Sequence, residues 1–163
     1  MPASDDPAAV LTRLLQAVDD LDWPAVRDCL ADEVRTDYTE LFGGAAETVS
    51  GDELVRRWQG LLPGFDATQH LIGTGRLEEG VGAGGDGPTV RTHVRGYHHI
   101  AGADGGATWG VHGHYVVPLV RSPGGWRIAG ITLRVFYQEG NTGLPALATE
   151  RAAISPRAAR AGR

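Results

Sequence analysis

The chain has 163 residues, which is enough for one domain with a hydrophobic core and too few for two. Its formal net charge of -5 gives no reason to expect nucleic acid or an anionic membrane as a partner, and no apolar stretch approaches the roughly 18 residues of a membrane helix. One cysteine, Cys29, excludes an intramolecular disulfide. Because the first residues also lack the features of a secretory signal, we expect a cytoplasmic protein that acts on a small molecule.

The first part of the chain shows helical patterns of apolar residues. An aspartate followed by proline, with apolar residues at helical spacing, predicts a helix over residues 6–19, and a second, short helix is expected over 23–30. A short strand is expected over 34–38, and the stretch 43–50 is interpreted as a loop leaving it. An S-G-D-E capping box then begins a third helix, which should extend over residues 50–62.

The pattern then changes to period two. Four stretches rich in Val, Ile, Thr, Tyr and Trp predict strands over residues 67–78, 89–100, 108–121 and 125–138, separated by turns with many glycines. Three helices followed by an antiparallel sheet give an α+β fold. Because long strands with helices on one face must curve around them, the expected shape is a cone with an internal pocket.

Residues 1–140 are expected to form this single domain, and residues 141–163 a C-terminal tail. The tail is rich in alanine and arginine and contains prolines, so its last ten residues are expected to be disordered. Alternatively, residues 144–154 fold over the pocket mouth as a lid.

Six short sequence motifs, which follow one another in a fixed order across residues 8–140, resemble those of a known family. They resemble the SnoaL-like branch of the nuclear transport factor 2-like (NTF2-like) superfamily and, within it, the scytalone dehydratase-like group. The motifs are LDW (21–23) after an aspartate, RTDY (35–38), TQHLIGTGR (68–76), THVRGY (92–97) before a histidine pair, GHYVVPLVR (113–121) and GWRIAG (125–130).

The resemblance implies the NTF2-like cone, in which three N-terminal helices and the concave face of a curved antiparallel sheet enclose a pocket. Members of the superfamily include dehydratases, polyketide cyclases, isomerases, epoxide hydrolases and dehydrohalogenases, together with proteins that have no catalytic role. The fold alone therefore does not name the reaction.

The resemblance also implies catalytic roles for His70, His98, Asp19 and Tyr38. His70 stands where the dehydratase-like group has a catalytic histidine, and an imidazole can take and return a proton near neutral pH. Asp19 would pair with a pocket histidine and fix its tautomer, with Asp20 as the alternative carboxylate. Tyr38 would donate a hydrogen bond to a developing enolate oxygen.

Each of these side chains also has a purely structural interpretation. Read alone, His70 is typical of a core histidine that is held by Thr68 or a backbone carbonyl. Asp19 is equally consistent with a solvated helix end, and Tyr38 with an aromatic core residue.

Strand alternation separates the other histidines into two faces. His98 and His99 must point to opposite sides of their strand, and the match with a second pocket histidine favours His98 for the pocket. His112 and His114 form an H-x-H pair, but alternation places both on the convex face without a carboxylate neighbour. No metal site is therefore expected.

The substrate-recognition positions depart from the dehydratase pattern. Gly113 and Tyr115 stand where that group has a serine and an asparagine that bind substrate, and Val18 stands where it has a pocket tyrosine. Scytalone itself is therefore not the expected substrate, and an apolar pocket for a cyclic or polyketide-like ligand is predicted instead. The other predicted lining residues are Trp58, Val94, Val111, Val117, Leu119, Ile131, Leu133 and Val135.

The leading functional hypothesis is a cofactor-independent dehydratase-type lyase of natural-product metabolism. A polyketide cyclase or an isomerase would use the same residues, because all three reactions begin with enolate formation in a dry pocket. A small-molecule binding protein without turnover is the alternative from another class. Because members of the family form dimers and trimers, the resemblance implies a homodimer or a homotrimer.

Overall fold

Alternating apolar side chains place much of the chain in a seven-stranded sheet, with helices on its concave side. The computed structural model describes residues 6–79 and 87–160. In chain order the elements are α1 (Pro7–Asp20), α2 (Trp23–Cys29), β1 (Leu30–Asp37), α3 (Thr39–Phe42), β2 (Glu47–Ser50), α4 (Gly51–Gln59), a 3-10 turn η1 (Leu62–Gly64), β3 (Ala67–Ile72), β4 (Arg76–Glu78), β5 (Thr89–His99), β6 (Thr108–Ser122), β7 (Gly125–Gly140) and α5 (Leu144–Ile154).

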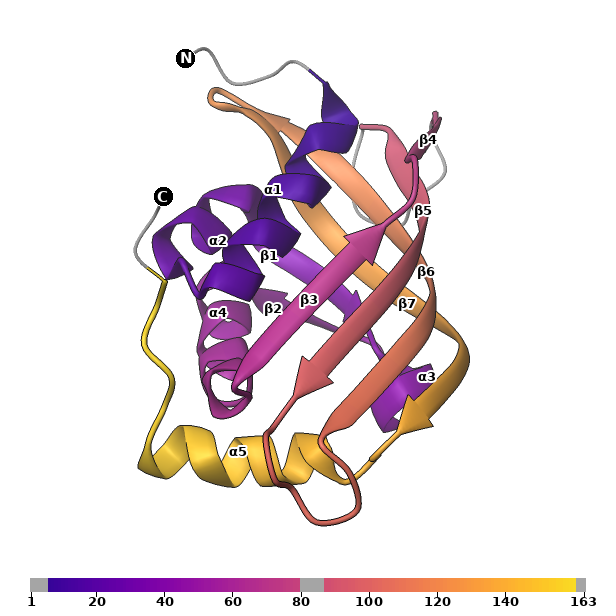
Figure 1. Cartoon of the computed structure of the whole chain (residues 1–163). Helices are drawn as coiled ribbons and strands as arrows, with labels where there is room; N and C mark the ends of the chain where they lie inside the picture. The colour runs from indigo at the N-terminus through magenta and orange to yellow at the C-terminus, as the bar shows by residue number, and fades with distance from the viewer. Residues whose placement is uncertain (1–5, 80–86, 161–163) are drawn as a thin grey trace.

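The sheet has the strand order β2-β1-β7-β6-β5-β3, with β4 paired to β5. All pairs are antiparallel except β1 with β7, which run parallel. Figure 1 shows α1, α2 and α4 on one face of the curved sheet and α5 across the open end of the cone. This is the expected α+β architecture. Within the described residues it has α3 and α5 in addition to the three helices that were predicted.

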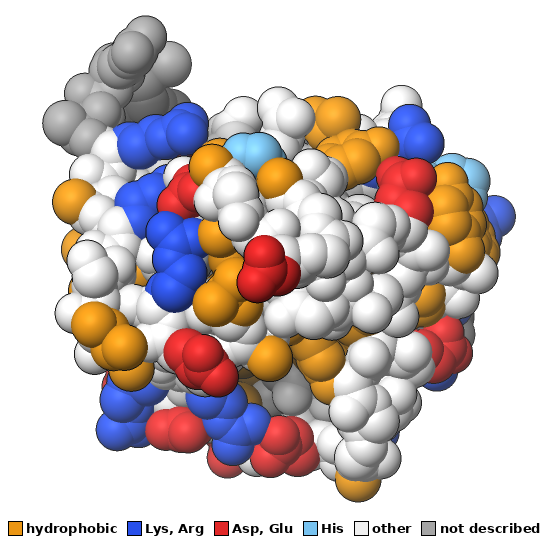
Figure 2. Space-filling model, turned by 60° about the horizontal axis from the view of Figure 1, so that its bottom comes forward, with side chains coloured by type: hydrophobic (Ala, Val, Ile, Leu, Met, Phe, Trp, Pro, Cys, Tyr) orange, Lys and Arg blue, Asp and Glu red, His pale blue; other side chains and the backbone are white. Residues whose placement is uncertain are grey.

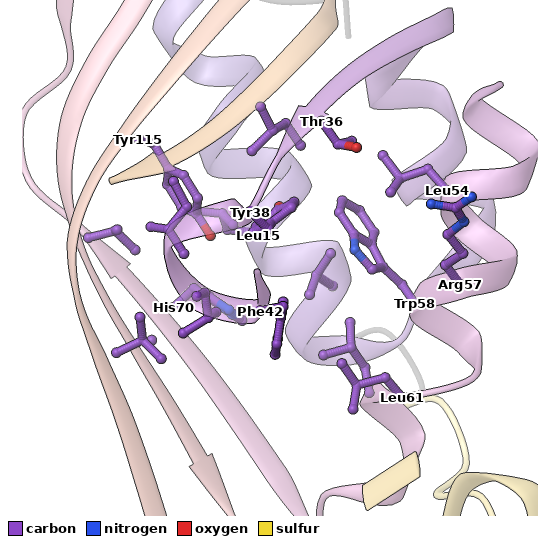
Figure 3. Close-up of a pocket in the computed structure, with 18 of the residues that line it drawn as sticks. Leu15, Thr36, Tyr38, Phe42, Leu54, Arg57, Trp58, Leu61, His70 and Tyr115 are labelled. Carbon is purple, nitrogen blue, oxygen red and sulfur yellow. The ribbon is translucent and has the colours of Figure 1, made fainter. Parts of the chain in front are cut away.

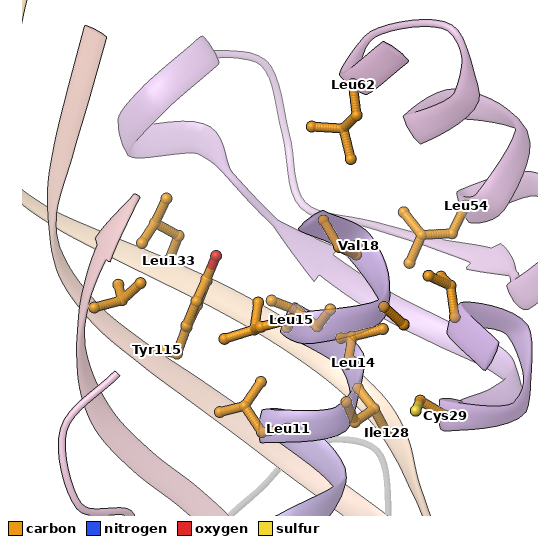
Figure 4. Close-up of a cluster of buried hydrophobic side chains, with 14 of the residues drawn as sticks. Leu11, Leu14, Leu15, Val18, Cys29, Leu54, Leu62, Tyr115, Ile128 and Leu133 are labelled. Atoms are coloured by element: carbon orange, nitrogen blue, oxygen red, sulfur yellow. The ribbon is translucent and has the colours of Figure 1, made fainter. Parts of the chain in front are cut away.

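Helix α1 is the central element of the core. Asp6 caps its first turn by accepting a hydrogen bond from the Ala8 amide, and Pro7 occupies the first helical position. Its apolar face is buried against the sheet and the other helices (Figure 4). The helix ends at Leu21, which adopts the left-handed conformation with a φ of 58°. The buried residues of this face are Val10, Leu11, Leu14, Leu15, Ala17 and Val18.

Two irregularities in the β6–β7 ladder bend the sheet around this helix. His112 pairs with Tyr137 whereas Gly113 pairs with Val135, so β7 carries an extra residue at Phe136. The register shifts again further along the same pair of strands. Extra residues of this kind increase the local twist, which wraps the sheet into a cone.

Two local predictions were wrong. The stretch 43–50 is not only a loop, because its second half forms β2 against β1, and the short helix α3 precedes it. The strand expected over 67–78 is broken into β3 and β4. The break falls at a G-T-G sequence where only one amide, that of Gly73, bonds to β5, through the carbonyl of His93.

The structure describes the C-terminal segment through residue 160. Helix α5 packs on η1 so closely that a side chain at Gly64 would meet the backbone of Ala148. After α5 the chain continues along the outside of the helical layer, where the amide of Arg157 bonds to Pro63 and that of Arg160 to Asp20. No helix among residues 6–79 and 87–160 is long and apolar enough to span a membrane.

Candidate active site

A cavity of about 350 Å³ lies between the concave face of the sheet and the helices. Figure 3 shows His70 and Tyr115 on the sheet side of this cavity and Trp58 of α4 on the other side. Most of its lining is apolar. The lining residues are Leu11, Leu14, Leu15, Val18, Thr36, Tyr38, Thr39, Leu41, Phe42, Gly43, Ala45, Glu47, Leu54, Arg57, Trp58, Leu61, Leu62, His70, Val94, Gly96, His98, Trp109, Val111, Tyr115, Ile131 and Leu133.

Asp19 and His70 form a hydrogen-bonded pair at the wall of this cavity. Asp19 is in the last turn of α1 and His70 is on β3, and His70 Nδ1 lies 2.7 Å from Asp19 Oδ1. Two further donors converge on the same carboxylate: the Thr68 hydroxyl bonds to Oδ1 at 2.9 Å and the His70 amide to Oδ2 at 2.8 Å. The side chains of Asp19 and His70 are only 18% and 11% exposed, so the pair is largely shielded from water.

The carboxylate of Asp19 is held in its ionised form. Burial by itself disfavours the charge, but the hydrogen bonds and the electrostatic interaction with His70, together with the Thr68 hydroxyl, lower the pKa of Asp19. An ionised carboxylate only accepts hydrogen bonds, so His70 must donate from Nδ1. In the neutral form of the ring, Nε2, next to Gly96, is then the nitrogen without a proton.

His98 lies beside His70 and has a different environment. The two rings are edge to face with centroids 5.5 Å apart, and His98 also packs against Phe65 and Trp109. Its Nδ1 lies 3.3 Å from the carbonyl oxygen of Trp109, which can only accept, so His98 donates from Nδ1. Burial, reinforced by His70, lowers the pKa of His98 to about 3. His98 is therefore neutral at pH 7, with Nε2 as a hydrogen-bond acceptor.

The burial of neutral His98 predicts a loss of stability in acid. In the unfolded chain His98 has a pKa near 6.5 and in the folded chain about 3, so between these values the unfolded state binds more protons. The free energy of unfolding should therefore decrease as pH falls through this window. His98→Gln should reduce that slope by roughly 1 kcal/mol per pH unit, as measured by urea unfolding at several pH values. The exposed His99→Gln serves as control, and an equal slope change there would contradict the prediction.

Two phenol groups face the cavity close to one another. Tyr38 follows β1 and Tyr115 is on β6, and burial raises the pKa of both well above the usual tyrosine value. Each hydroxyl therefore stays protonated, and neither has a hydrogen-bond partner among the residues that the structure describes. Both are available as donors to a bound molecule.

The structure brings most of the other predicted lining residues to the cavity. Val18, Trp58, Val94, Tyr115, Ile131 and Leu133 line it, as does Val111.

Four predicted lining residues do not border the cavity. Gly113 faces the backbone of β7, where an added Cβ would lie 1.9 Å from the Arg134 carbonyl oxygen. Val117 and Leu119 are fully buried in the hydrophobic core and are not among the lining residues. Val135 lies at the bulge of β7 and is excluded from the lining by the change in register. Strand alternation could predict which side chains share a face of the sheet, but not how far along each strand the cavity extends.

Several lining residues were missed by the sequence analysis. Phe42, with its neighbours in and after α3, lines the cavity, but this four-residue helix has no periodic signal. Arg57 of α4 and Glu47 of β2, two consecutive elements, form an ion pair at the polar side of the lining. Trp109 could have been found, because it alternates in phase with Val111 on β6.

The remaining histidines lie on the outer side of the sheet. His112 is buried by Tyr137, which stacks on it, and its ring nitrogens contact Arg95 and Glu139, so the expectation that the H-x-H pair has no carboxylate neighbour was wrong. His114 packs against Phe136. Among the described residues, no three His, Cys, Asp or Glu side chains are placed to hold a metal ion.

Comparisons with known proteins identify the family. The model of the SnoaL-like domain matches residues 6–132. Among solved structures, Kfla4162 from Kribbella flavida is 25% identical, with a TM-score of 0.76 over 85% of this chain and 93% of that one. A candidate scytalone dehydratase from Novosphingobium aromaticivorans is 14% identical, with a TM-score of 0.66 over 82% and 83%. Hexachlorocyclohexane dehydrochlorinase LinA-type3 from Novosphingobium barchaimii is 18% identical, with a TM-score of 0.59 over 83% and 90%.

No curated protein matches the sequence. The last two structures are too distant in sequence to show more than a common fold, whereas the family model spans most of the domain. The chain belongs to the SnoaL-like domain family and has the NTF2-like fold.

Proposed function

We propose that the protein is a cofactor-independent lyase that removes water from a β-hydroxy carbonyl compound of cyclic or polyketide-like type. The observation that carries this proposal is the Asp19–His70 pair at the wall of an apolar cavity. A base held in this way is suited to taking a proton from carbon next to a carbonyl group. The dehydratase and dehydrochlorinase among the structural neighbours, both named for elimination reactions, support the same class of chemistry.

The proposed reaction uses a single proton that returns to the leaving group. His70 Nε2 takes the proton from the α-carbon, and the electrons of that C–H bond form an enolate. The enolate electrons then form the carbon–carbon double bond while the bond from the β-carbon to the hydroxyl oxygen breaks. Protonated His70 gives the proton to the departing oxygen, which leaves as water. Asp19 stabilises the imidazolium that exists between these two steps.

The negative charge on the enolate oxygen needs donors, and the two tyrosines supply them. Tyr38 and Tyr115 are protonated and unpaired within the described residues, so a carbonyl oxygen placed between them would receive hydrogen bonds that strengthen as charge develops. His98 Nε2 can accept a hydrogen bond from the substrate hydroxyl and so orient it. The apolar walls keep out water that would weaken these interactions.

The cavity favours a substrate without a negative charge. Arg57, the basic residue of its lining, is bonded to Glu47 and Glu53. The guanidinium charge is thus balanced before any ligand binds. A cyclisation or a double-bond isomerisation of a neutral carbonyl compound remains the second candidate, because the same enolate would be its intermediate.

Hydrogen exchange in D₂O tests the proposal without knowledge of the natural substrate. The protein would be incubated with a panel of neutral cyclic ketones and β-hydroxy ketones, and ¹H NMR would follow the signal of the proton next to the carbonyl. We expect accelerated loss of this signal for ligands that bind, and formation of the unsaturated ketone when a β-hydroxyl is present. Ligands that bind, as shown by saturation transfer, but never exchange would contradict the proposal and indicate a binding protein.

A further inference from the structure

The end of α1 that carries Asp19 is electrostatically unfavourable by itself. A helix C-terminus has a partial negative charge and is stabilised by basic side chains, yet the last turn of α1 has no basic residue and contains Asp19 and Asp20. The amides of Leu21 and Asp22 cap the carbonyls of Ala17 and Val18, but the carbonyls of Asp19 and Asp20 receive donors from elsewhere in the chain. The local sequence therefore accounts for only part of what holds this turn in place.

The C-terminal tail supplies the missing cation. After α5 the chain rises along the outside of the helical layer to the end of α1 (Figure 1). Arg157 Nη1 donates to the carbonyl oxygen of Asp19 at 3.4 Å, and Nε of the same guanidinium donates to the carbonyl oxygen of Phe65 at 3.2 Å. Burial, the largest effect, and the neighbouring Arg160 lower the pKa of Arg157, and the smaller effects of Asp19, Asp20 and Asp66 oppose them.

One guanidinium thus joins the two segments that carry the pair. Asp19 is at the end of α1, and Phe65 lies two residues before β3, the strand with Thr68 and His70. The peptide groups of the tail fix the guanidinium in turn, because the Arg157 amide donates to Pro63 at 2.8 Å and the Arg160 amide to Asp20 at 2.9 Å. Figure 2 looks onto the face with α5 and shows basic side chains gathered along one side of it.

We infer that Arg157 is a positioning residue, which clamps the end of α1 to the start of β3 and so holds the Asp19 carboxylate against His70. This role rests on the proposed function of the pair. Arg157 does not line the cavity, so it acts through Asp19 and not on the substrate. Its Nη2 atom is buried without a hydrogen-bond partner among the described residues. The arginine is therefore held there despite an incompletely satisfied side chain, which costs free energy.

The clamp can be tested without substrate by ¹H NMR of the full chain. The proton on His70 Nδ1, shared with Asp19 at 2.7 Å, should give a downfield signal that exchanges slowly with water. Arg157→Gln should broaden this signal or move it upfield, because the carboxylate is no longer fixed. Arg157→Lys keeps a charged donor and should retain most of the signal. The matched control is Arg160→Gln, since the Arg160 side chain is exposed and only its backbone bonds to α1.

A second control separates positioning from loss of stability. Arg151→Gln removes the 2.6 Å ion pair with Asp66 and so loosens α5 without touching the carbonyl of Asp19. If Arg151→Gln weakens the His70 signal as much as Arg157→Gln does at a similar loss of melting temperature, the inference is overturned. An unchanged signal in Arg157→Gln would also overturn it.

Turnover provides the last readout. If the proposed lyase activity is present, Arg157→Gln should lower kcat about tenfold with little change in KM, and Arg157→Lys should restore most of it. Absence of activity in the wild type would refute the proposed function, yet the NMR comparison would still decide whether Arg157 positions Asp19.

Discussion

His70→Ala is expected to lower kcat by about 10²- to 10⁴-fold, because it removes the group that both takes and returns the proton. In the neutral form of His70, Nε2 is the ring nitrogen that is not hydrogen-bonded to Asp19, whereas burial keeps His98 from accepting a proton. His98 should therefore not replace His70. The measurement is steady-state turnover of a ketone that exchanges in D₂O, together with a binding titration of the same ligand.

The matched control for this substitution is His99→Ala. His99 is on the same sheet but exposed, so its loss should leave kcat unchanged. Ligand affinity should change little in His70→Ala, because the apolar walls and the two tyrosines remain. Full turnover in His70→Ala would show that another group is the base, and a loss of binding without a loss of kcat would support a binding role for His70.

Asp19→Asn is expected to lower kcat by about two orders of magnitude or more, although it changes the side chain by very little. Three donors converge on the carboxylate, and an amide can accept at only one of its two ends. If its NH₂ group faces the His70 ring, Nδ1 must become an acceptor and the proton moves to Nε2, which abolishes the base. If it faces the His70 amide, two donors are forced together and the pair is distorted.

Asp20→Asn is the matched control, because it changes the same charge at an exposed neighbouring position. Stability provides a second measurement with a defined pH dependence. The pKa of Asp19 is lower in the folded chain, so its carboxylate stabilises the fold above its ordinary value of 3.8, and that contribution is lost as pH falls through the folded pKa. Asp19→Asn should thus unfold at lower urea concentration at pH 7, and the difference should shrink in acid. A difference independent of pH would contradict this account of the pair.

The sequence predicted the parts of the fold that have strong periodic patterns. Helices α1, α2 and α4 and the long strands β5, β6 and β7 lie within a few residues of their expected bounds. The short helix α3 could not be predicted, because it depends on contacts outside itself. Asp37 accepts hydrogen bonds from the amide and the hydroxyl of Thr39, and Glu40 is held by Arg134 and the amide of Val135.

For the candidate site, the sequence could predict which residues take part and on which face of a strand they lie. The family motifs and strand alternation pointed to His70, His98, Asp19 and Tyr38, whose roles remain predictions. The depth of the cavity and the course of the tail were not predictable. The first depends on bulges between β6 and β7, and the second on an arginine whose guanidinium bonds to a backbone carbonyl 138 positions away in the sequence.

The parallel pairing of β1 with β7 has a consequence for how the chain folds. Strand β1 is made early and β7 late, and the pairing joins the two arms of the sheet around the cavity. Contacts between such distant segments slow folding, because a long loop must close before they form. The cavity is therefore completed only when nearly all of the domain has left the ribosome. Until then the apolar face of α1 has no complete sheet to pack against and stays exposed. The nascent chain should therefore depend on chaperones, or on rapid pairing of β1 with β7 once β7 is made, to avoid aggregation.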